Sequence, residues 1–211
     1  MLLKHTIKVK KGSDSLPVME SFYSIQGEGY HSGKSAYFIR LAGCDVNCKW
    51  CDVKESWEIK ENQYVKVSKI IDKVKKIKSD VVVITGGEPL CHNLEILTYG
   101  IRKLGKKIHL ETSGTEPLTG EFDWICLSPK KFKKPLEKYL SISDELKIII
   151  FNSSDFRWAE KYANKMNKNS ELILQPEWSV EKKMNPLILD YIKKNPKWKI
   201  SLQIHKYLNV D

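Results

Sequence analysis

Short apolar runs alternate with amphipathic stretches along most of this chain. Apolar alternation or continuous apolar runs predict strands over residues 17–25, 35–41, 81–84, 108–111, 124–127, 145–150, 172–174 and 198–204. Apolar residues at helical spacing predict helices over 66–78, 93–104, 155–166 and 186–194, with Ser68 as a candidate cap of the first. Strands that alternate with helices imply parallel βα units with right-handed crossovers. About six such units are too few for a closed eight-fold barrel.

We therefore expect an α/β fold, an open, partial (β/α) barrel that forms a single domain over residues 1–211. Residues 1–16 would be an N-terminal extension or an edge strand. Polar and glycine-rich segments follow the predicted strands, and in parallel barrels such segments build the active site. These segments are Gln26-Gly27-Glu28-Gly29, Gly86-Gly87-Glu88-Pro89, Thr112-Ser113-Gly114, Ser128-Pro129-Lys130, Gln175-Pro176 and the last one, His205-Lys206. Each taken alone is also compatible with an ordinary turn or a serine helix cap.

Three cysteines, Cys44, Cys48 and Cys51, lie at C-x3-C-x2-C spacing within residues 43–52. The N-terminus has no signal-peptide core, so we expect a reducing, cytoplasmic environment and a metal rather than a disulfide. A closed zinc site would require a fourth ligand at regular spacing. Cys91 and Cys126 are too scattered for that role and are interpreted as buried small apolar residues. The cysteines could instead hold an iron–sulfur cluster with one open iron, although a zinc knuckle remains an alternative.

The composition changes this interpretation little. Hydrophobic residues make up 41% and charged residues 29% of the 211 residues, which is typical of a soluble globular protein without a membrane span. The net charge is +10, but nearly all basic residues are lysines, and Arg40, Arg102 and Arg157 are the only arginines. Base-edge recognition favours arginine, so we predict no direct binding of nucleic acid. A basic surface would favour docking of an acidic electron donor.

The cysteine spacing followed by Gly86-Gly87-Glu88-Pro89 resembles the radical S-adenosylmethionine (SAM) superfamily. The resemblance implies a [4Fe–4S] cluster on the three cysteines, with SAM bound to the fourth iron. It implies that Trp50 shields the cluster. The residues expected to bind SAM are Gly86, Gly87, Glu88, Ser113, Ser128, Pro129, Lys130 and Gln175.

From about residue 18 onward the chain resembles, within that superfamily, the 7-carboxy-7-deazaguanine synthase family. This implies rearrangement of 6-carboxy-5,6,7,8-tetrahydropterin with loss of ammonia, in the biosynthesis of queuosine-type 7-deazapurines. A 5′-deoxyadenosyl radical would remove hydrogen from C6 of the pterin and SAM would then be regenerated. A flavodoxin- or ferredoxin-like reductant and a homodimer are also implied. The residues expected to bind the substrate are Ile25, Gln26, Gly27, Glu28, Arg40, Thr85, His205 and Asp211.

One position departs from that family. Cys-Asp-Thr in the family supplies a hydroxyl ligand for Mg²⁺, whereas this chain has Cys51-Asp52-Val53, and valine offers no side-chain oxygen. The sequence therefore puts Mg²⁺ dependence in doubt. Two alternatives remain, an activase of a glycyl-radical enzyme and a non-enzymatic zinc or nucleic-acid-binding module.

Overall fold

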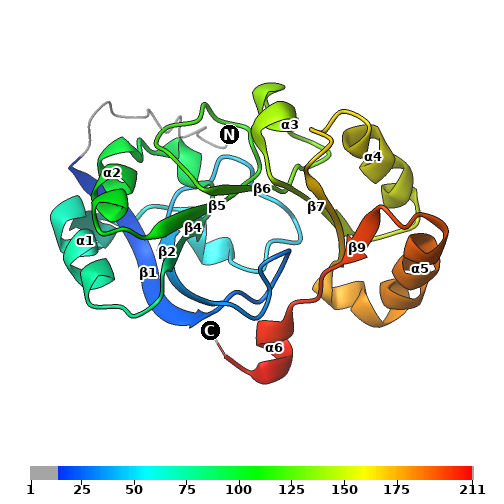
Figure 1. The fold of residues 1–211 in the computed structure, drawn as a ribbon, viewed down its shortest axis with the longest axis horizontal. Coiled ribbons are helices and arrows are strands. Elements are labelled where there is room, and N and C mark those ends of the chain that lie inside the picture. The colour runs from blue at the N-terminus through cyan, green and yellow to red at the C-terminus, as the bar shows by residue number, and fades with distance from the viewer. Residues whose placement is uncertain (1–13, 211) are drawn as a thin grey trace, which may run out of the picture.

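A computed structural model describes residues 14–210 and shows a curved sheet that is covered by helices on its outer face (Figure 1). The sheet of the described residues has nine strands in the order β3-β1-β2-β4-β5-β6-β7-β8-β9. The strands are β1 (Ser15–Ile25), β2 (Ser35–Leu41), β3 (Tyr64–Lys66), β4 (Val81–Gly86), β5 (Lys107–Thr112), β6 (Trp124–Leu127), β7 (Glu145–Ile150), β8 (Glu171–Pro176) and β9 (Trp198–Ile200). The helices are α1 (Val67–Lys75), α2 (Glu95–Lys103), α3 (Lys138–Ile142), α4 (Ser154–Ala163), α5 (Glu181–Lys194) and α6 (Ile204–Leu208).

The strands β2 and β4–β9 run parallel, while β1 forms antiparallel pairs with β2 and β3. The two end strands, β3 and β9, do not pair, so the barrel stays open (Figure 1). The prediction of an open, partial (β/α) barrel is confirmed. Short 3-10 turns (Lys54–Ser56, Glu61–Gln63, Pro89–Cys91 and Trp178–Val180) lie in the connections.

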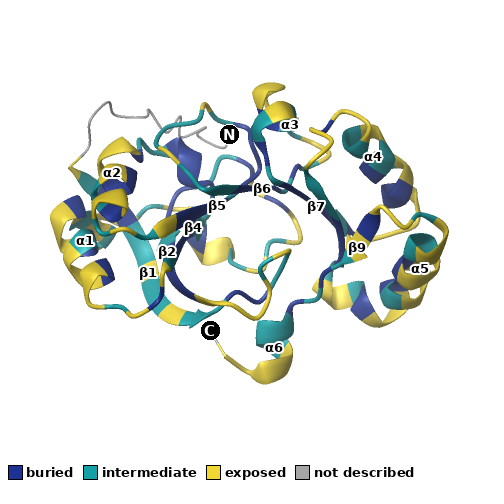
Figure 2. Ribbon diagram, viewed as in Figure 1, coloured by how far each residue is buried: buried dark blue, intermediate teal, exposed yellow. Residues whose placement is uncertain are grey.

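The main core lies between the sheet and the helices outside it. Figure 2 shows the buried residues on the strands and on the sheet-facing sides of the helices, with exposed residues on the outer sides. On β4, Val82 and Ile84 join this core, while Val83 between them packs inside the barrel with Ala36 and Phe38. The continuous apolar run at 81–84 is therefore covered on both faces, as expected of a parallel strand.

Side chains alternate between the two faces of each strand, so every second residue of β5–β8 points into the barrel. Many of these inward positions are polar or charged, including Glu111, Lys147 and Gln175, and all three line the same interior cavity. The barrel therefore has an apolar outer face, and its interior is polar along β5–β8. No helix among the described residues is long and apolar enough to cross a membrane.

Several predicted boundaries are wrong. The first helix begins at Val67 with Lys66 as its N-cap, so Ser68 lies inside the helix and does not cap it. The helix predicted to begin at Pro186 begins at Glu181, because the proline is accommodated within its second turn. The strand predicted over 198–204 ends at Ile200, and His205 belongs to α6. At the N-terminus, residues 1–13 lie outside the described residues, and Ser15–Pro17 pair with β3.

Candidate functional site

A cavity of about 440 Å³ occupies the barrel interior at the carboxyl ends of the parallel strands. Its lining brings together residues from the whole chain, from Phe22 to Lys206. Almost every predicted site residue with a described position lines it: Ile25, Gln26, Gly27, Glu28, Arg40, Cys44, Cys48, Cys51, Thr85, Gly86, Gly87, Glu88, Ser113, Ser128, Lys130, Gln175 and His205. Pro129 instead lines a smaller cavity of about 140 Å³ beside it, and Asp211 lies outside the described residues.

The cysteine loop (residues 43–52) is attached to its surroundings mainly through the backbone. The N–H of Gly43 donates to Ser56 O at 2.7 Å, and the N–H of Cys44 donates to Trp57 O at 3.2 Å. His92 Nε2 lies 2.7 Å from Ala42 O, just before the loop, which gives this histidine a structural role. The loop thus has defined anchors at its beginning.

The Gly86-Gly87-Glu88 segment lies directly against the cysteine loop. The N–H of Gly87 donates to Leu41 O at 3.0 Å, and that of Glu88 donates to Gly43 O at 2.9 Å. Gly86 has φ +142°, and a Cβ there would lie 2.1 Å from Leu41 O. A Cβ at Gly87 would lie 2.7 Å from the Cβ of Cys44. Only glycine fits at either position, which explains physically why the two motifs occur together.

Glu88 is 1% exposed, and its carboxylate connects β4 to the end of β5. It accepts hydrogen bonds from Thr112 Oγ1 at 2.6 Å, from the Ser113 N–H at 2.8 Å and from the Leu90 N–H at 3.2 Å. Ser113 Oγ also donates to it. Both oxygens are thus engaged by protein donors, so the carboxylate fixes this wall of the cavity.

The three cysteines are free thiols that line one cavity. Burial raises the pKa of Cys44, and it raises the pKa of Cys48 to about 11 despite the nearby Lys130 ammonium. The protein alone therefore favours neutral thiols at Cys44 and Cys48, whereas bound iron would deprotonate them. In the described part of the chain, no group of three or more His, Cys, Asp or Glu side chains is close enough together to hold a single metal ion. A four-iron cluster offers separate irons to separate thiolates, so its ligands need not converge as those of zinc do.

Lys130 and Ser128 of the Ser-Pro-Lys motif lie together in the cavity lining. Lys130 Nζ donates to Ser128 Oγ at 2.9 Å and also to Ser128 O. Burial lowers the pKa of Lys130. The ammonium is therefore a desolvated donor facing the cysteine side of the cavity.

Charged and amide side chains form the floor of the cavity. Lys147 Nζ lies 2.8 Å from Glu28 Oε2 and 2.9 Å from Glu111 Oε2. Gln203 Nε2 donates to Glu28 Oε1 at 2.7 Å, and Gln26 Nε2 donates to Glu111 Oε1 at 3.4 Å. We call these five residues the floor network. Sequence reasoning missed Lys147 entirely, although a lysine within the strand Glu145-Leu-Lys-Ile-Ile-Ile was the available signal.

Electrostatics within the floor network are strong because the groups are buried. Burial alone would raise the pKa of Glu28, but the Lys147 charge and amide donors of Gln203 and Gln175 lower it to about 2. Burial would lower the pKa of Lys147, but Glu111 and Glu28 raise it well above its usual range. Lys147 and Glu28 are therefore ionised at neutral pH.

Three further predicted residues have defined partners. Arg40 Nε lies 2.6 Å from Glu20 Oε1, and its guanidinium lies over the Phe22 ring. Gln175 Oε1 accepts from Ser201 Oγ at 2.9 Å, which places this amide beside the floor rather than at the rim. A Cβ at Gly27 would lie 2.1 Å from His205 Nδ1, so the glycine allows α6 to pack closely over the cavity.

Trp50 lies between Cys48 and Cys51 and is 37% exposed. Its ring stacks on Phe151 with centroids 6.4 Å apart and meets Phe132 edge-on at 6.0 Å. Cys91 and Cys126 are buried, at 3% and 1% exposure, as predicted. Burial raises the pKa of both thiols, which fits inert core residues.

Comparisons with known proteins agree with this geometry. Residues 38–123 match the model of the Radical SAM superfamily. A 7-carboxy-7-deazaguanine synthase from Flavobacterium psychrophilum is 52% identical over 97% of this chain and 96% of the relative. Enzymes of the same name from Synechocystis and Escherichia coli are 47% and 34% identical, over 93% and 92% of this chain and 94% and 98% of each relative. The crystal structure of QueE from Escherichia coli matches with a TM-score of 0.81 and 28% identity, over 89% of this chain and 93% of that one.

Proposed function

The chain belongs to the 7-carboxy-7-deazaguanine synthase family of radical SAM enzymes, and we propose that its cavity rearranges 6-carboxy-5,6,7,8-tetrahydropterin to 7-carboxy-7-deazaguanine, with release of ammonia. The observation that carries the proposal is that one cavity joins three free thiols, the Gly86-Gly87-Glu88 wall and a charged floor. The named relatives favour this activity over a glycyl-radical activase. They also favour it over a zinc or nucleic-acid-binding module.

The radical SAM family uses a [4Fe–4S] cluster and SAM, and the residues present fit both groups. Cys44, Cys48 and Cys51 would hold three irons, because all are unpaired and line the cavity together. When bound, the reduced cluster and SAM supply a radical that abstracts a hydrogen atom from the substrate. The main chain at Gly86 and Gly87 would face the methionine part of SAM at close range, since neither residue has a side chain there.

Polar groups on either side of that wall would hold the rest of SAM. Ser128 and Lys130 offer hydroxyl and ammonium donors to ribose and carboxylate oxygens, and Ser113 Oγ, which donates to Glu88, could accept from a ribose hydroxyl. We assign the adenine to the side of the cavity near Gln175, with the Ser128-Pro129-Lys130 turn shaping the edge. These contacts would position the reacting atoms and exclude water from them.

The opposite side of the cavity would bind the pterin. The amide and amine edge of the pterin would form hydrogen bonds with the side chains of Gln26 and Glu28 and with the backbone of Ile25 and Gly27. Arg40 suits the substrate carboxylate because a guanidinium can donate two parallel hydrogen bonds. Thr85 would orient the substrate, and His205 would close the site.

Mg²⁺ has no evident side-chain ligand at residue 53. Val53 lines the cavity without an oxygen, and the neighbouring Asp52 Oδ2 lies 3.3 Å from Gln203 Nε2 and 3.4 Å from Lys206 Nζ. Since the available carboxylate is already paired with nitrogen donors, we propose that catalysis here depends weakly on Mg²⁺.

An anaerobic assay tests the proposed function. The enzyme with reconstituted cluster is given dithionite, SAM and 6-carboxytetrahydropterin, and products are identified by mass spectrometry. We expect 7-carboxy-7-deazaguanine in amounts exceeding the SAM supplied, because SAM is regenerated. Cleavage of SAM to 5′-deoxyadenosine with the pterin unchanged would refute the proposal and favour an activase.

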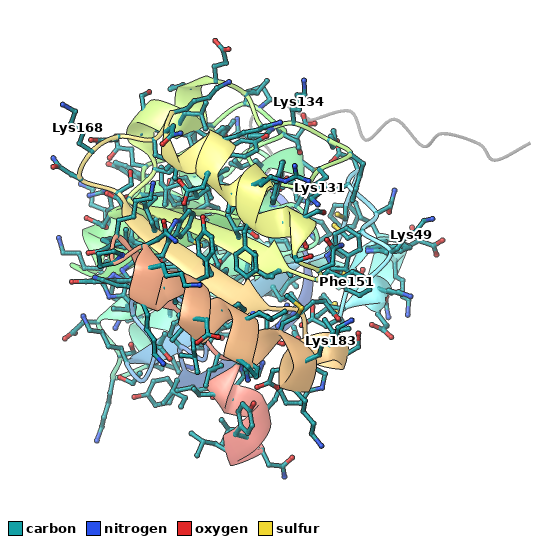
Figure 3. All side chains as sticks on the ribbon, turned by 90° about the vertical axis from the view of Figure 1, so that its right-hand side faces the viewer. Lys49, Lys131, Lys134, Phe151, Lys168 and Lys183 are labelled. Atoms are coloured by element: carbon teal, nitrogen blue, oxygen red, sulfur yellow. The ribbon has the colours of Figure 1, made fainter. Side chains whose placement is uncertain are left out.

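We further propose that an acidic flavodoxin- or ferredoxin-like protein delivers the electron at a surface beside the cysteine loop. Three aromatic side chains are exposed there: Trp50 by 37%, Phe132 by 54% and Phe151 by 46%. Figure 3 shows Lys49, Lys131, Lys134 and Lys183 around Phe151 on this side of the molecule. Among the described residues, Lys49, Lys134 and Lys183 form no ion pair, unlike Lys131, which pairs with Asp155. An apolar centre within a basic rim suits an acidic partner.

Charge reversal tests this surface. The triple variant K49E/K134E/K183E should lower turnover driven by a purified flavodoxin and its reductase about tenfold or more at low salt. Turnover driven by dithionite should be unchanged, because that reductant needs no docking. The matched control K69E/K73E/K75E, on α1, should resemble the wild type. An equal loss in both triple variants would mean that net charge, rather than this surface, matters.

We also propose a homodimer, as the family resemblance implies. Sedimentation equilibrium of the purified enzyme measures this directly. A monomer at micromolar concentration would refute it.

A further inference from the structure

The floor network has an arrangement that the reaction outlined above leaves unexplained. Lys147 is 5% exposed and its ammonium lies between two carboxylates, 2.8 Å from Glu28 and 2.9 Å from Glu111. A buried lysine with two carboxylate partners is expensive to desolvate and is rare without a structural or functional reason. Its position at the cavity floor indicates that the reason concerns the ligand.

The floor network also closes the open side of the barrel. Glu28 follows β1, which lies next to the end strand β3, and Gln203 follows β9, the other end strand, while Lys147 and Glu111 come from β7 and β5. The same seam is joined by the Gly29 N–H donating to Ser201 Oγ at 2.8 Å and the Ile204 N–H donating to Gly27 O at 3.0 Å. Lys147 therefore connects the sheet to the segment that carries Gln26 and Glu28.

The charges of the floor network do not cancel. Two carboxylates and one ammonium leave one net negative charge in a desolvated site. Glu28 accepts hydrogen bonds from Lys147, Gln203 and Gln175, and a carboxylate has about four acceptor positions in all. Spare acceptor capacity with excess negative charge suits a planar ligand edge rich in N–H donors.

We propose that Lys147 is a positioning residue for the substrate: it holds the Glu28 carboxylate ionised and oriented so that this carboxylate accepts N–H bonds from the amine and amide edge of the pterin. The inference rests on the proposed function and adds to it a residue that the family resemblance did not single out. Lys147 acts through Glu28 and does not itself contact the reacting atoms.

Other charged groups face the floor network and enter its titration. Cys126 on β6 and Glu145 on β7 act on Lys147, and His205 on α6 lies close enough to Glu28 to be affected by its charge. Lys130, at the rim, is affected by Lys147.

The test is a double-mutant cycle in the holoenzyme: wild type, Lys147→Met, Glu28→Gln and the double variant, with dithionite as reductant. We expect Lys147→Met to raise the substrate KM about tenfold or more and to change kcat less. Its KM should fall as the pH rises, because Glu28, no longer held ionised by the ammonium, must lose its proton before it can accept from the pterin. In the Glu28→Gln background, Lys147→Met should have no further effect on KM. Calorimetry of pterin binding to the SAM-loaded enzyme gives a readout independent of turnover.

Two controls separate positioning from stability. Lys106→Met removes another partly buried ammonium, which bonds Ile77 O at 2.9 Å far from the cavity, and should leave KM unchanged. If Lys147→Met alone does not fold, the comparison of Glu28→Gln with the double variant still decides, since both retain Glu111. A further rise in KM in the double variant, or a Lys147→Met enzyme with wild-type KM and pH profile, overturns the inference. Failure of the wild type to convert the pterin would instead refute the proposed function.

Discussion

Two walls of the same cavity are built on different physical principles. The wall on the cysteine side is built from backbone: the N–H groups of Gly87 and Glu88 bond directly to the chain around the cysteine loop. The floor on the opposite side is built from side chains, with Lys147 between two carboxylates. The first arrangement depends on shape, since Gly86 and Gly87 have no room for a Cβ. The second depends on charge.

This difference fits what each wall would bind. A cluster and the main part of SAM require close approach of the backbone, and glycine supplies it without any ionisable group. A small heterocycle must be distinguished by its donors and acceptors, and buried charges do this best because an unmatched ligand leaves them unpaired. Mutations should therefore act through sterics on one wall and through protonation on the other.

The largest expected effect is steric and falls on the cysteine side. Gly86→Ala should destabilise the fold by about 3 kcal/mol or more, because its Cβ would lie 2.1 Å from Leu41 O at φ +142°. Iron content and visible absorbance after reconstitution should fall with it. Gly33→Ala is the matched control, since φ is +88° but nothing lies within 4 Å, and should lose only about 1–2 kcal/mol. Equal losses would show that backbone strain alone, rather than contact, matters at Gly86.

A smaller effect concerns two carboxylates of the barrel interior and depends on pH. Burial and the Glu111 charge raise the pKa of Glu145 from 4.5 to about 7, whereas Lys147 helps to lower that of Glu28 to about 2. As the pH rises from 4.5 to 7, the unfolded chain ionises at Glu145 before the folded protein does, so stability falls. Glu28 acts in the opposite sense and contributes stability that is lost as the pH falls from 4.5 towards 2.

Urea unfolding at pH 5 and pH 7 measures the first contribution. The wild type should lose stability on the order of 2 kcal/mol between pH 5 and pH 7 through Glu145. The Glu145→Gln variant should not show this loss, because an amide does not titrate. Glu28→Gln should keep that loss, because its own contribution lies at lower pH. If the two variants show the same pH dependence, the proposed distinction between Glu145, which has no ion pair among the described residues, and Glu28, which is paired with Lys147, is wrong.

The smallest expected effect is at Val53, where the cysteine side presents a side chain rather than backbone. Removing Mg²⁺ with EDTA should change the wild-type rate less than about twofold, because valine offers no oxygen ligand. Val53→Thr should acquire Mg²⁺ stimulation, and Val65→Thr, a half-buried valine on β3, should not. A wild-type rate that falls tenfold without Mg²⁺ would mean that other groups bind the ion.

Much of the fold could be predicted from the sequence because local patterns decide it. The strand over 124–127 and that over 145–150 have the predicted bounds, since each is a short apolar run between turn residues. The end of the chain was predicted less well. The short β9 and α6 depend on packing against Gly27 and Ser201 rather than on their own periodicity, so the predicted strand ran four residues too far, to Ile204.

The sequence by itself determined the chemistry of the cysteine side. Closely spaced thiols and glycines can be recognised in the sequence, because ligand spacing and backbone freedom are properties of a few adjacent residues. The contacts of the floor network, in contrast, were decided only by the tertiary structure. Lys147 lies 36 residues from Glu111 and 119 from Glu28 along the chain. A lysine in an apolar strand can face either solvent or two buried carboxylates. Which of the two occurs depends on which strand ends lie close together in the curved sheet, and no local sequence pattern contains that information.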